Sequence, residues 1–113
     1  MNNKVLGFSG ESQAAKLLKT KKYKIIATNY VCPIGEIDII ANDKNVIVFV
    51  EVKTRLTEKY GLPREAVTRF KQQKLKNLAK YYLKNHNLLD CPARFDVIEV
   101  FDGETNHIIN AFY

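Results

Sequence analysis

The chain has 113 residues, of which 46% are hydrophobic, and this is enough apolar material for the core of a single domain. No stretch approaches the roughly 18 consecutive apolar residues of a membrane span, and the N-terminus lacks a hydrophobic signal region, so we expect a cytoplasmic protein. Cys32 and Cys91 are far apart, and with two histidines they are too few for a zinc cluster. We expect reduced thiols and one domain over residues 1–113, with about the first eight residues flexible.

The net charge of +6 is unevenly distributed along the chain. Ten Lys or Arg residues and only two acids lie between Lys53 and Lys84, whereas one Arg and five acids occur from Asn85 onward. A basic surface of this kind suits a polyanion such as nucleic acid. A solvated helix face with its counter-ions explains the same composition, and the charges alone leave both interpretations open.

The first predicted element is a helix over Glu11–Lys19, with Ser9 as its N-cap. Its inward stripe consists of Ala14, Leu17 and Leu18. Glu11 falls near this stripe at the predicted helix start. A carboxylate in the first turn is favoured by the helix dipole, and from the helix pattern alone this explanation of Glu11 is preferred to a functional role.

Strands are predicted next, beginning with residues 23–30 and followed by a break at Pro33 and Gly35. Residues 35–41 and 46–53 are rich in Ile and Val and predict a hairpin around a turn within residues 42–45. Both hairpin strands carry acids where a buried strand should be apolar. Burying an ionised carboxylate is costly without a compensating cation. These acids therefore indicate that the hairpin uses negative charge for a purpose other than packing.

The predicted register of this hairpin places its acids on one face. A two- or four-residue turn is expected to set Ala41 opposite Val46, with Asp38 opposite Phe49 and diagonal to Glu51. A three-residue turn would move the side chains of one strand to the other face, so this inference depends on an even turn.

A loop is predicted over residues 54–61, and a helix follows from about Thr68 to Asn87, after a first turn that begins near Pro63. Its inward stripe consists of Leu75, Leu78, Ala79, Tyr82 and Leu83. Extended toward the helix start, the stripe reaches Lys71 and Gln72. These two side chains either extend past the end of the core or reach the polar site of the hairpin.

The remaining elements are strands over residues 93–101 and 107–112, joined by a turn at 102–104. A strand, a long helix and a further strand imply a right-handed crossover to a parallel neighbour. The predicted class is therefore α/β, with an αβββαβ core, a mixed sheet flanked by helices and an extra C-terminal strand.

The hairpin acids suggest a specific chemistry. Mg²⁺ and Mn²⁺ prefer oxygen ligands, so Asp38 and Glu51 are expected to hold such an ion, with the backbone carbonyl of Val52 completing its coordination. Lys53 would then orient a water molecule or stabilise developing charge. The pattern D-x₁₂-E-x-K is weak alone, because surface strands contain Glu-x-Lys by chance. Its position on two buried strands before a basic helix favours the functional interpretation.

Nucleic-acid contacts are expected from the loop beside the site and from the start of the basic helix. The candidates are Arg55, Lys59, Tyr60, Arg69, Lys71, Gln72 and Lys74.

Several segments together resemble the YraN family of small bacterial proteins that are predicted to be nucleases. They are Gly10-Glu11 with Ala14-Ala15, Gly35-Glu36-Ile37-Asp38-Ile39-Ile40-Ala41, Val48-Phe49-Val50-Glu51-Val52-Lys53-Thr54-Arg55, Tyr60-Gly61-Leu62-Pro63-Arg64-Glu65-Ala66-Val67, Arg94-Phe95-Asp96-Val97 and Asn110-Ala111-Phe112.

This resemblance implies the PD-(D/E)xK superfamily and its restriction-endonuclease-like fold, similar to archaeal Holliday junction resolvases. Asp38, Glu51 and Lys53 match the core motif, and Glu11 matches the additional helix-borne acid of resolvase-like members. The Pro of the superfamily name is Ile37 here. The resemblance also implies a homodimer.

We therefore expect a Mg²⁺- or Mn²⁺-dependent endonuclease that hydrolyses phosphodiester bonds in structured or branched DNA. The alternative is a nucleic-acid-binding module on a nuclease scaffold with little or no catalysis, which would bind with strong salt dependence and without turnover. A purely structural domain ranks last, because it leaves the hairpin acids unexplained.

Overall fold

A computed structural model describes residues 3–55 and 67–112, with side chains from residue 10 onward within these ranges. The elements in chain order are α1 (Asn3–Thr20), β1 (Lys24–Cys32), β2 (Gly35–Asp43), β3 (Val46–Arg55), α2 (Arg69–Asn85), β4 (Ala93–Phe101) and β5 (Glu104–Phe112). Most of the predicted loop after Thr54, including Lys59 and Tyr60, lies outside the described residues, as does Pro63.

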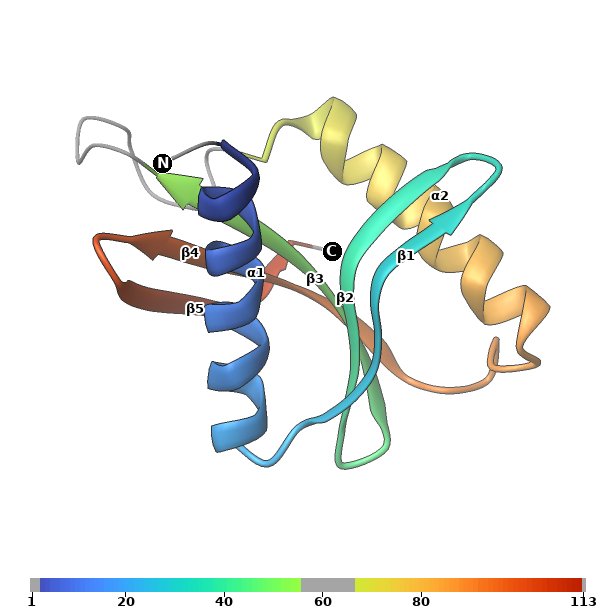
Figure 1. Ribbon diagram of the computed structural model, residues 1–113. Helices are drawn as coiled ribbons and strands as arrows, with labels where there is room; N and C mark the ends of the chain where they lie inside the picture. Colours follow the sequence, from blue (N-terminus) through green and yellow to red (C-terminus); the bar gives the residue numbers. More distant parts are fainter. Residues whose placement is uncertain (1–2, 56–66, 113) are drawn as a thin grey trace.

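The five strands form one sheet in the order β1-β2-β3-β4-β5. Neighbours are antiparallel except β3 and β4, which are parallel and joined through α2. The two helices lie on opposite faces of the sheet (Figure 1). The predicted α/β class, the mixed sheet with its flanking helices and the extra C-terminal strand are therefore confirmed.

Two buried clusters fill the space between the sheet and its helices. On one face, Ala14 and Leu18 of α1 pack with alternate residues of the central strands, such as Val48 and Val50. On the other face, the predicted stripe of α2 packs against the remaining strand residues, including Phe49 and Val97. Because both faces of β2, β3 and β4 are covered, these strands are almost continuously apolar, as strands in a doubly covered sheet usually are.

The predicted register of the β2–β3 hairpin is wrong by two residues. Ala41 pairs with Val48, not with Val46, because the turn consists only of Lys44 and Asn45. Both turn residues have positive φ angles, 50° and 72°, as a tight hairpin turn of this length requires. The turn is nevertheless even, so the predicted faces are retained along the paired part of the hairpin, residues 39–43 and 46–50.

The first helix also begins earlier than predicted. α1 starts at Asn3, so Ser9 lies inside the helix and is not its N-cap. Glu11 consequently lies in the middle of α1. The first turn of α1 contains no acidic residue. Stabilisation of the helix dipole by a first-turn carboxylate therefore does not explain Glu11.

The β2 strand changes its orientation at Asp38. Ile37 and Ile40 both belong to the cluster beneath α2, whereas strict alternation would place them on opposite faces. Asn29, next to this point on β1, has a φ of 51°, and the described β2–β3 ladder ends at the pair Ile39–Val50. Figure 1 shows β2 and β3 diverging beyond this point, with β2 turning toward α2.

No helix among the described residues is long and apolar enough to cross a membrane.

Candidate functional site

The candidate site lies where β2 and β3 separate. Beyond the pair Ile39–Val50, the next residues on the two strands are Asp38 and Glu51. The backbone pairing of β2 and β3 ends here, so polar side chains can lie where the two strands separate. Continued by one residue, the observed register would bring Asp38 level with Glu51, whereas the predicted register had Asp38 diagonal to Glu51.

Asp38 is fixed by a backbone hydrogen bond across the opening. The N–H of Val52 donates to Oδ2 of Asp38 at 2.8 Å. Burial, and then the charge of Glu51, raise the pKa of Asp38 from 3.8 to about 6, against the opposing effect of the Val52 N–H. The charge of Glu11 adds to this increase, whereas that of Lys71 reduces it. The site thus contains a carboxyl group whose ionised form is disfavoured relative to an exposed carboxyl group.

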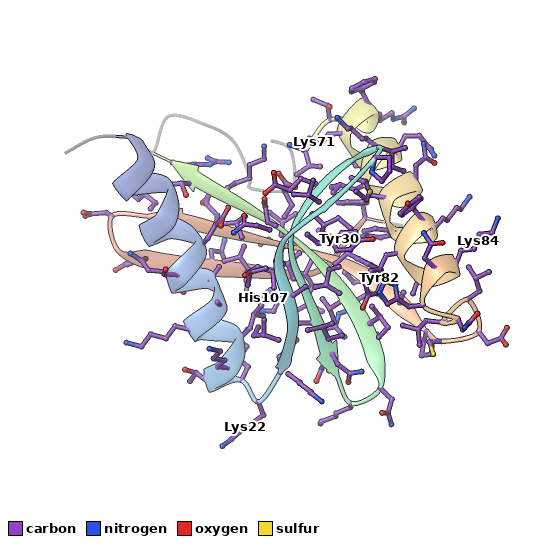
Figure 2. The ribbon with its side chains drawn as sticks, turned by 45° about the vertical axis from the view of Figure 1, so that its right-hand side comes forward. Lys22, Tyr30, Lys71, Tyr82, Lys84 and His107 are labelled. Carbon is purple, nitrogen blue, oxygen red and sulfur yellow. The ribbon has the colours of Figure 1, made fainter. Side chains whose placement is uncertain are left out.

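Glu51 is buried, with an exposed fraction of 7%, and two lysines compensate its charge. Nζ of Lys71 lies 3.1 Å from Oε1 of Glu51, and Nζ of Lys53 lies 3.8 Å from the same oxygen. Lys71 therefore reaches the hairpin site, which decides between the two interpretations of this residue. Figure 2 shows Lys71 near the start of α2.

These groups border a cavity of about 300 Å³ between β2, β3 and the first turns of α2. Its lining combines two predicted acids and two predicted cations with residues that were not predicted to be in a site. The lining residues are Glu36, Asp38, Glu51, Phe70, Lys71, Lys74, Leu75 and Leu78.

The remaining predicted contacts are distributed differently. Arg55 forms an ion pair with Glu99 of β4, and its side chain is only 9% exposed. Gln72 donates from Nε2 to the carbonyl oxygen of Val67, a residue just before α2. Arg69 is exposed at the first residue of α2. Of the predicted nucleic-acid contacts, Lys71 and Lys74 are thus the two described residues that line the cavity.

Sequence reasoning missed Glu36 and Phe70 as site residues. Glu36 shares a strand face with Asp38 in the sequence pattern, and this signal could have identified it. Phe70 lies outside the apolar stripe of α2, and an aromatic residue that the core does not use was the available signal.

The donor set suits a divalent ion that keeps most of its ligands as water or phosphate. No group of three or more His, Cys, Asp or Glu side chains among the described residues could hold a metal. Mg²⁺, however, is commonly bound through only one or two carboxylates. Asp38 and Glu51 provide two carboxylates that line one cavity, and burial together with the charge of Glu51 raises the pKa of Asp38.

A second buried polar cluster joins the other end of α1 to the sheet. Asp96 accepts hydrogen bonds from the backbone N–H of Asn110 and from Arg94, and its Oδ2 lies 2.7 Å from Nε2 of His107. Nζ of Lys21 lies 2.8 Å from Nδ1 of His107 and can only donate, so Nε2 carries the proton toward Asp96. Arg94 also donates a hydrogen bond to the hydroxyl of Tyr23 and forms an ion pair with Asp43. Every charged member has a partner, which favours a structural role.

Comparisons with known proteins agree with the motif-based resemblance. Residues 10–100 match the model of the uncharacterised protein family UPF0102. A UPF0102 protein of Thermodesulfovibrio yellowstonii is 51% identical over 108 residues, which cover 96% of each chain. Relatives from Clostridioides difficile, 48% identical, and Caldicellulosiruptor saccharolyticus, 46% identical, are matched over 99% and 97% of this chain and over 100% and 93% of their own.

These relatives have nearly the same length as this chain, and their names, UPF0102 protein in each case, specify no reaction. The family inferred from the motifs, YraN, is confirmed, whereas the superfamily assignment stays a prediction. The chain belongs to the uncharacterised protein family UPF0102.

Proposed function

We propose that this protein is a divalent-metal-dependent endonuclease of the PD-(D/E)xK superfamily that acts on structured or branched DNA. The observation that carries the proposal is that Asp38 and Glu51, from neighbouring strands, line one cavity together with two lysines of α2. Paired carboxylates in a basic cavity suit a divalent ion together with a phosphate.

Each residue has a role that follows from its position. Asp38 and Glu51 would hold Mg²⁺ or Mn²⁺, with the carbonyl of Val52 as a further ligand. When bound, this ion would polarise the scissile phosphate and acidify a water molecule. The N–H of Val52 orients Asp38, and Lys53, close to Glu51, is placed to orient the water or stabilise developing negative charge.

The surrounding residues adjust the charge of the site. Lys71 compensates Glu51 and is free to turn toward a phosphate once an ion supplies that compensation. Lys74 is exposed at the cavity and offers a second phosphate contact. The negative charge of Glu11 acts on Asp38, in keeping with the role of an additional acid in resolvase-like enzymes.

A second candidate function is DNA binding without catalysis. One observation favours it: Nζ of Lys71, 3.1 Å from Glu51, already provides the positive charge that a metal would bring. In this alternative the lysine permanently occupies the position of the ion, and the protein binds nucleic acid through its basic surface alone.

Metal titration combined with a substrate screen separates the two functions. Labelled junction, flap, single-stranded and duplex DNA, with matched RNA, are incubated with the protein and Mn²⁺ or Mg²⁺. The nuclease proposal predicts cleavage that Asp38→Ala abolishes, and calorimetric binding of Mn²⁺ that the same variant weakens. DNA binding with neither metal binding nor cleavage would favour the alternative. Sedimentation equilibrium of the protein tests the implied homodimer.

A further inference from the structure

Phe70 is an aromatic side chain that the fold leaves in solvent. It is 81% exposed, the highest value among the large hydrophobic side chains that the structure describes as exposed, and it is the one aromatic residue among them. The neighbouring turns of α2 bury Leu75 and Leu78 instead. Packing therefore does not explain why a phenyl ring occupies this position.

The ring lies at the candidate site and not elsewhere on the surface. Phe70 lines the same cavity as Asp38 and Glu51, and it directly precedes Lys71, whose ammonium group contacts Glu51. One cavity thus combines a π-surface, a cation and a pair of carboxylates. These are the groups that would contact a base, a phosphate and a metal ion, the parts that a nucleotide brings to a nuclease.

Bases differ in their access to such a ring. In a duplex, each base already stacks on its neighbours, so a protein side chain reaches a base face only after the base is extruded, which costs free energy. Unpaired bases have free faces and stack on aromatic side chains with little dependence on sequence. An exposed ring beside the reacting phosphate therefore favours substrates with unpaired nucleotides.

We propose that Phe70 is a substrate-positioning residue that stacks on an unpaired base next to the scissile phosphate. The preferred substrate class is then DNA with a single-stranded segment at the site, such as a flap, a gapped strand or an open junction arm, and not continuous duplex. This inference rests on the proposed nuclease function and specifies its substrate.

The absence of tryptophan from the chain makes a direct test possible. Phe70→Trp, in a Glu51→Gln background that keeps DNA intact, places the sole indole of the protein at the cavity. Stacking predicts quenching of its fluorescence by a single-stranded oligonucleotide and by flap DNA, and little change with a duplex of equal length. Quenching by all three to the same extent, or by none, would overturn the proposal.

Binding measurements provide the second arm of the test. Loss of one stacked base predicts about 5- to 150-fold weaker binding of single-stranded DNA by Phe70→Ala, with duplex binding changed by less than about 2-fold. Phe70→Leu should behave like Phe70→Ala, and Phe70→Tyr like the wild type, because stacking needs an aromatic face. Leu89→Ala is the matched control, since Leu89 is 61% exposed beyond the other end of α2.

The outcomes separate this inference from the nuclease proposal. If the wild type cuts DNA and Phe70→Ala cuts flap and duplex with unchanged preference, the stacking role is wrong and the nuclease stands. If single strands quench the indole but no substrate is cut, stacking stands and the nuclease is wrong. If Phe70→Ala converts a dimer into monomers in sedimentation equilibrium, the ring belongs to a subunit interface and the stacking role is wrong.

Discussion

Asp38 illustrates how a single residue can serve a site at the expense of stability. Its carboxyl group is buried and lies near the charge of Glu51. Burial and this charge together raise the pKa of Asp38 to about 6. A carboxyl group that binds its proton more tightly in the folded than in the unfolded state destabilises the fold when it is ionised. The cost is therefore full above about pH 6 and disappears as the pH falls below about 4, where both states are protonated.

Replacing this carboxylate by an amide should consequently stabilise the protein. Asp38→Asn can still accept the N–H of Val52, and it removes the charge. We expect the free energy of unfolding in urea to rise by about 1–3 kcal/mol near pH 8 and to be nearly unchanged near pH 4. Asp90→Asn, at an exposed turn, is the control and should have little effect at either pH. Destabilisation by Asp38→Asn at pH 8 would contradict this account.

Asp96 shows the opposite behaviour in the second buried polar cluster. Burial alone would raise its pKa, but hydrogen bonds from His107, Asn110 and Arg94 outweigh burial and hold the pKa below its usual value. Its ionised form therefore stabilises the fold above the unfolded-state pKa, and this contribution is lost as the pH falls through the folded-state pKa.

The corresponding prediction concerns Asp96→Asn. An amide cannot accept all three groups of donors, so we expect a loss of about 2–4 kcal/mol in the free energy of unfolding at pH 7. Urea denaturation across pH values should show the loss undiminished down to about pH 4 and shrinking only below it. A loss that vanished well above pH 4 would contradict control of the cluster by the ionised carboxylate of Asp96.

At the scale of elements, α1 approaches β3 closely at Gly10 and Thr54. A Cβ atom added to Gly10 would overlap Oγ1 of Thr54. Glycine in a helix costs about 1 kcal/mol relative to alanine, so its presence here is explained by the contact and not by helix propensity. Gly10 directly precedes Glu11 on α1, and Thr54 lies three residues after Glu51 on β3.

A double-mutant cycle tests this contact. Gly10→Ala should destabilise the wild type by about 1–3 kcal/mol, in spite of its better helix propensity, because the methyl group overlaps Thr54. In a Thr54→Ala background the same substitution should be neutral or stabilising, since the nearest remaining atom, Cβ, lies at an ordinary contact distance of 3.5 Å. Equal effects in both backgrounds, measured by urea denaturation, would show that the two residues do not meet.

Sequence patterns predicted most elements because local chemistry determined them. The apolar stripe of α2 and the alternating strand residues led to the observed faces, and β4 was predicted with its observed bounds. The register of β2 and β3 was missed because Lys44 and Asn45 adopt positive φ angles that are typical of glycine and asparagine turns, leaving Asp43 in the strand. Arg94 of β4 forms an ion pair with Asp43. A local sequence pattern cannot predict this long-range contact.

The site was predictable in composition but not in geometry. Asp38 and Glu51 were identified by burial of charge in apolar strands, and an even turn kept them on one face. The divergence of β2 and β3 at Asp38, which creates the cavity, depends on the bend beside Asn29 and on packing against α2. These are tertiary effects, so Phe70 could not be assigned to the cavity from periodicity alone, whereas the predicted face of Glu36 was an available signal.

At the scale of the whole molecule, the net charge of +6 is unevenly distributed, and two of the basic residues line the candidate cavity. Lys71 and Lys74 line the cavity at the start of α2, whereas Lys84 lies near its other end, pointing away from the sheet (Figure 2). If DNA occupies the cavity, the lysines at the start of α2 should neutralise phosphates and release counter-ions, and Lys84 should contribute little.

The salt dependence of DNA binding tests this arrangement. Lys74→Gln should reduce the slope of log K against log salt concentration by about 1, and Lys84→Gln should leave the slope unchanged. Fluorescence anisotropy with a flap substrate, in a Glu51→Gln background that prevents cleavage, provides the measurement. Equal changes for the two lysines would mean that DNA lies along the whole helix and not at the cavity.

The most direct test of the nuclease proposal is the cleavage rate of flap and junction DNA with Mn²⁺, compared between the wild type and two carboxyl variants. We expect Glu51→Gln to reduce the rate by at least about 100-fold, because a metal ligand is lost, and Asp90→Asn to retain it within about 2-fold. Circular dichroism should show that both variants are folded. Cleavage by Glu51→Gln at the wild-type rate, or no cleavage of any substrate by the wild type, would contradict the account.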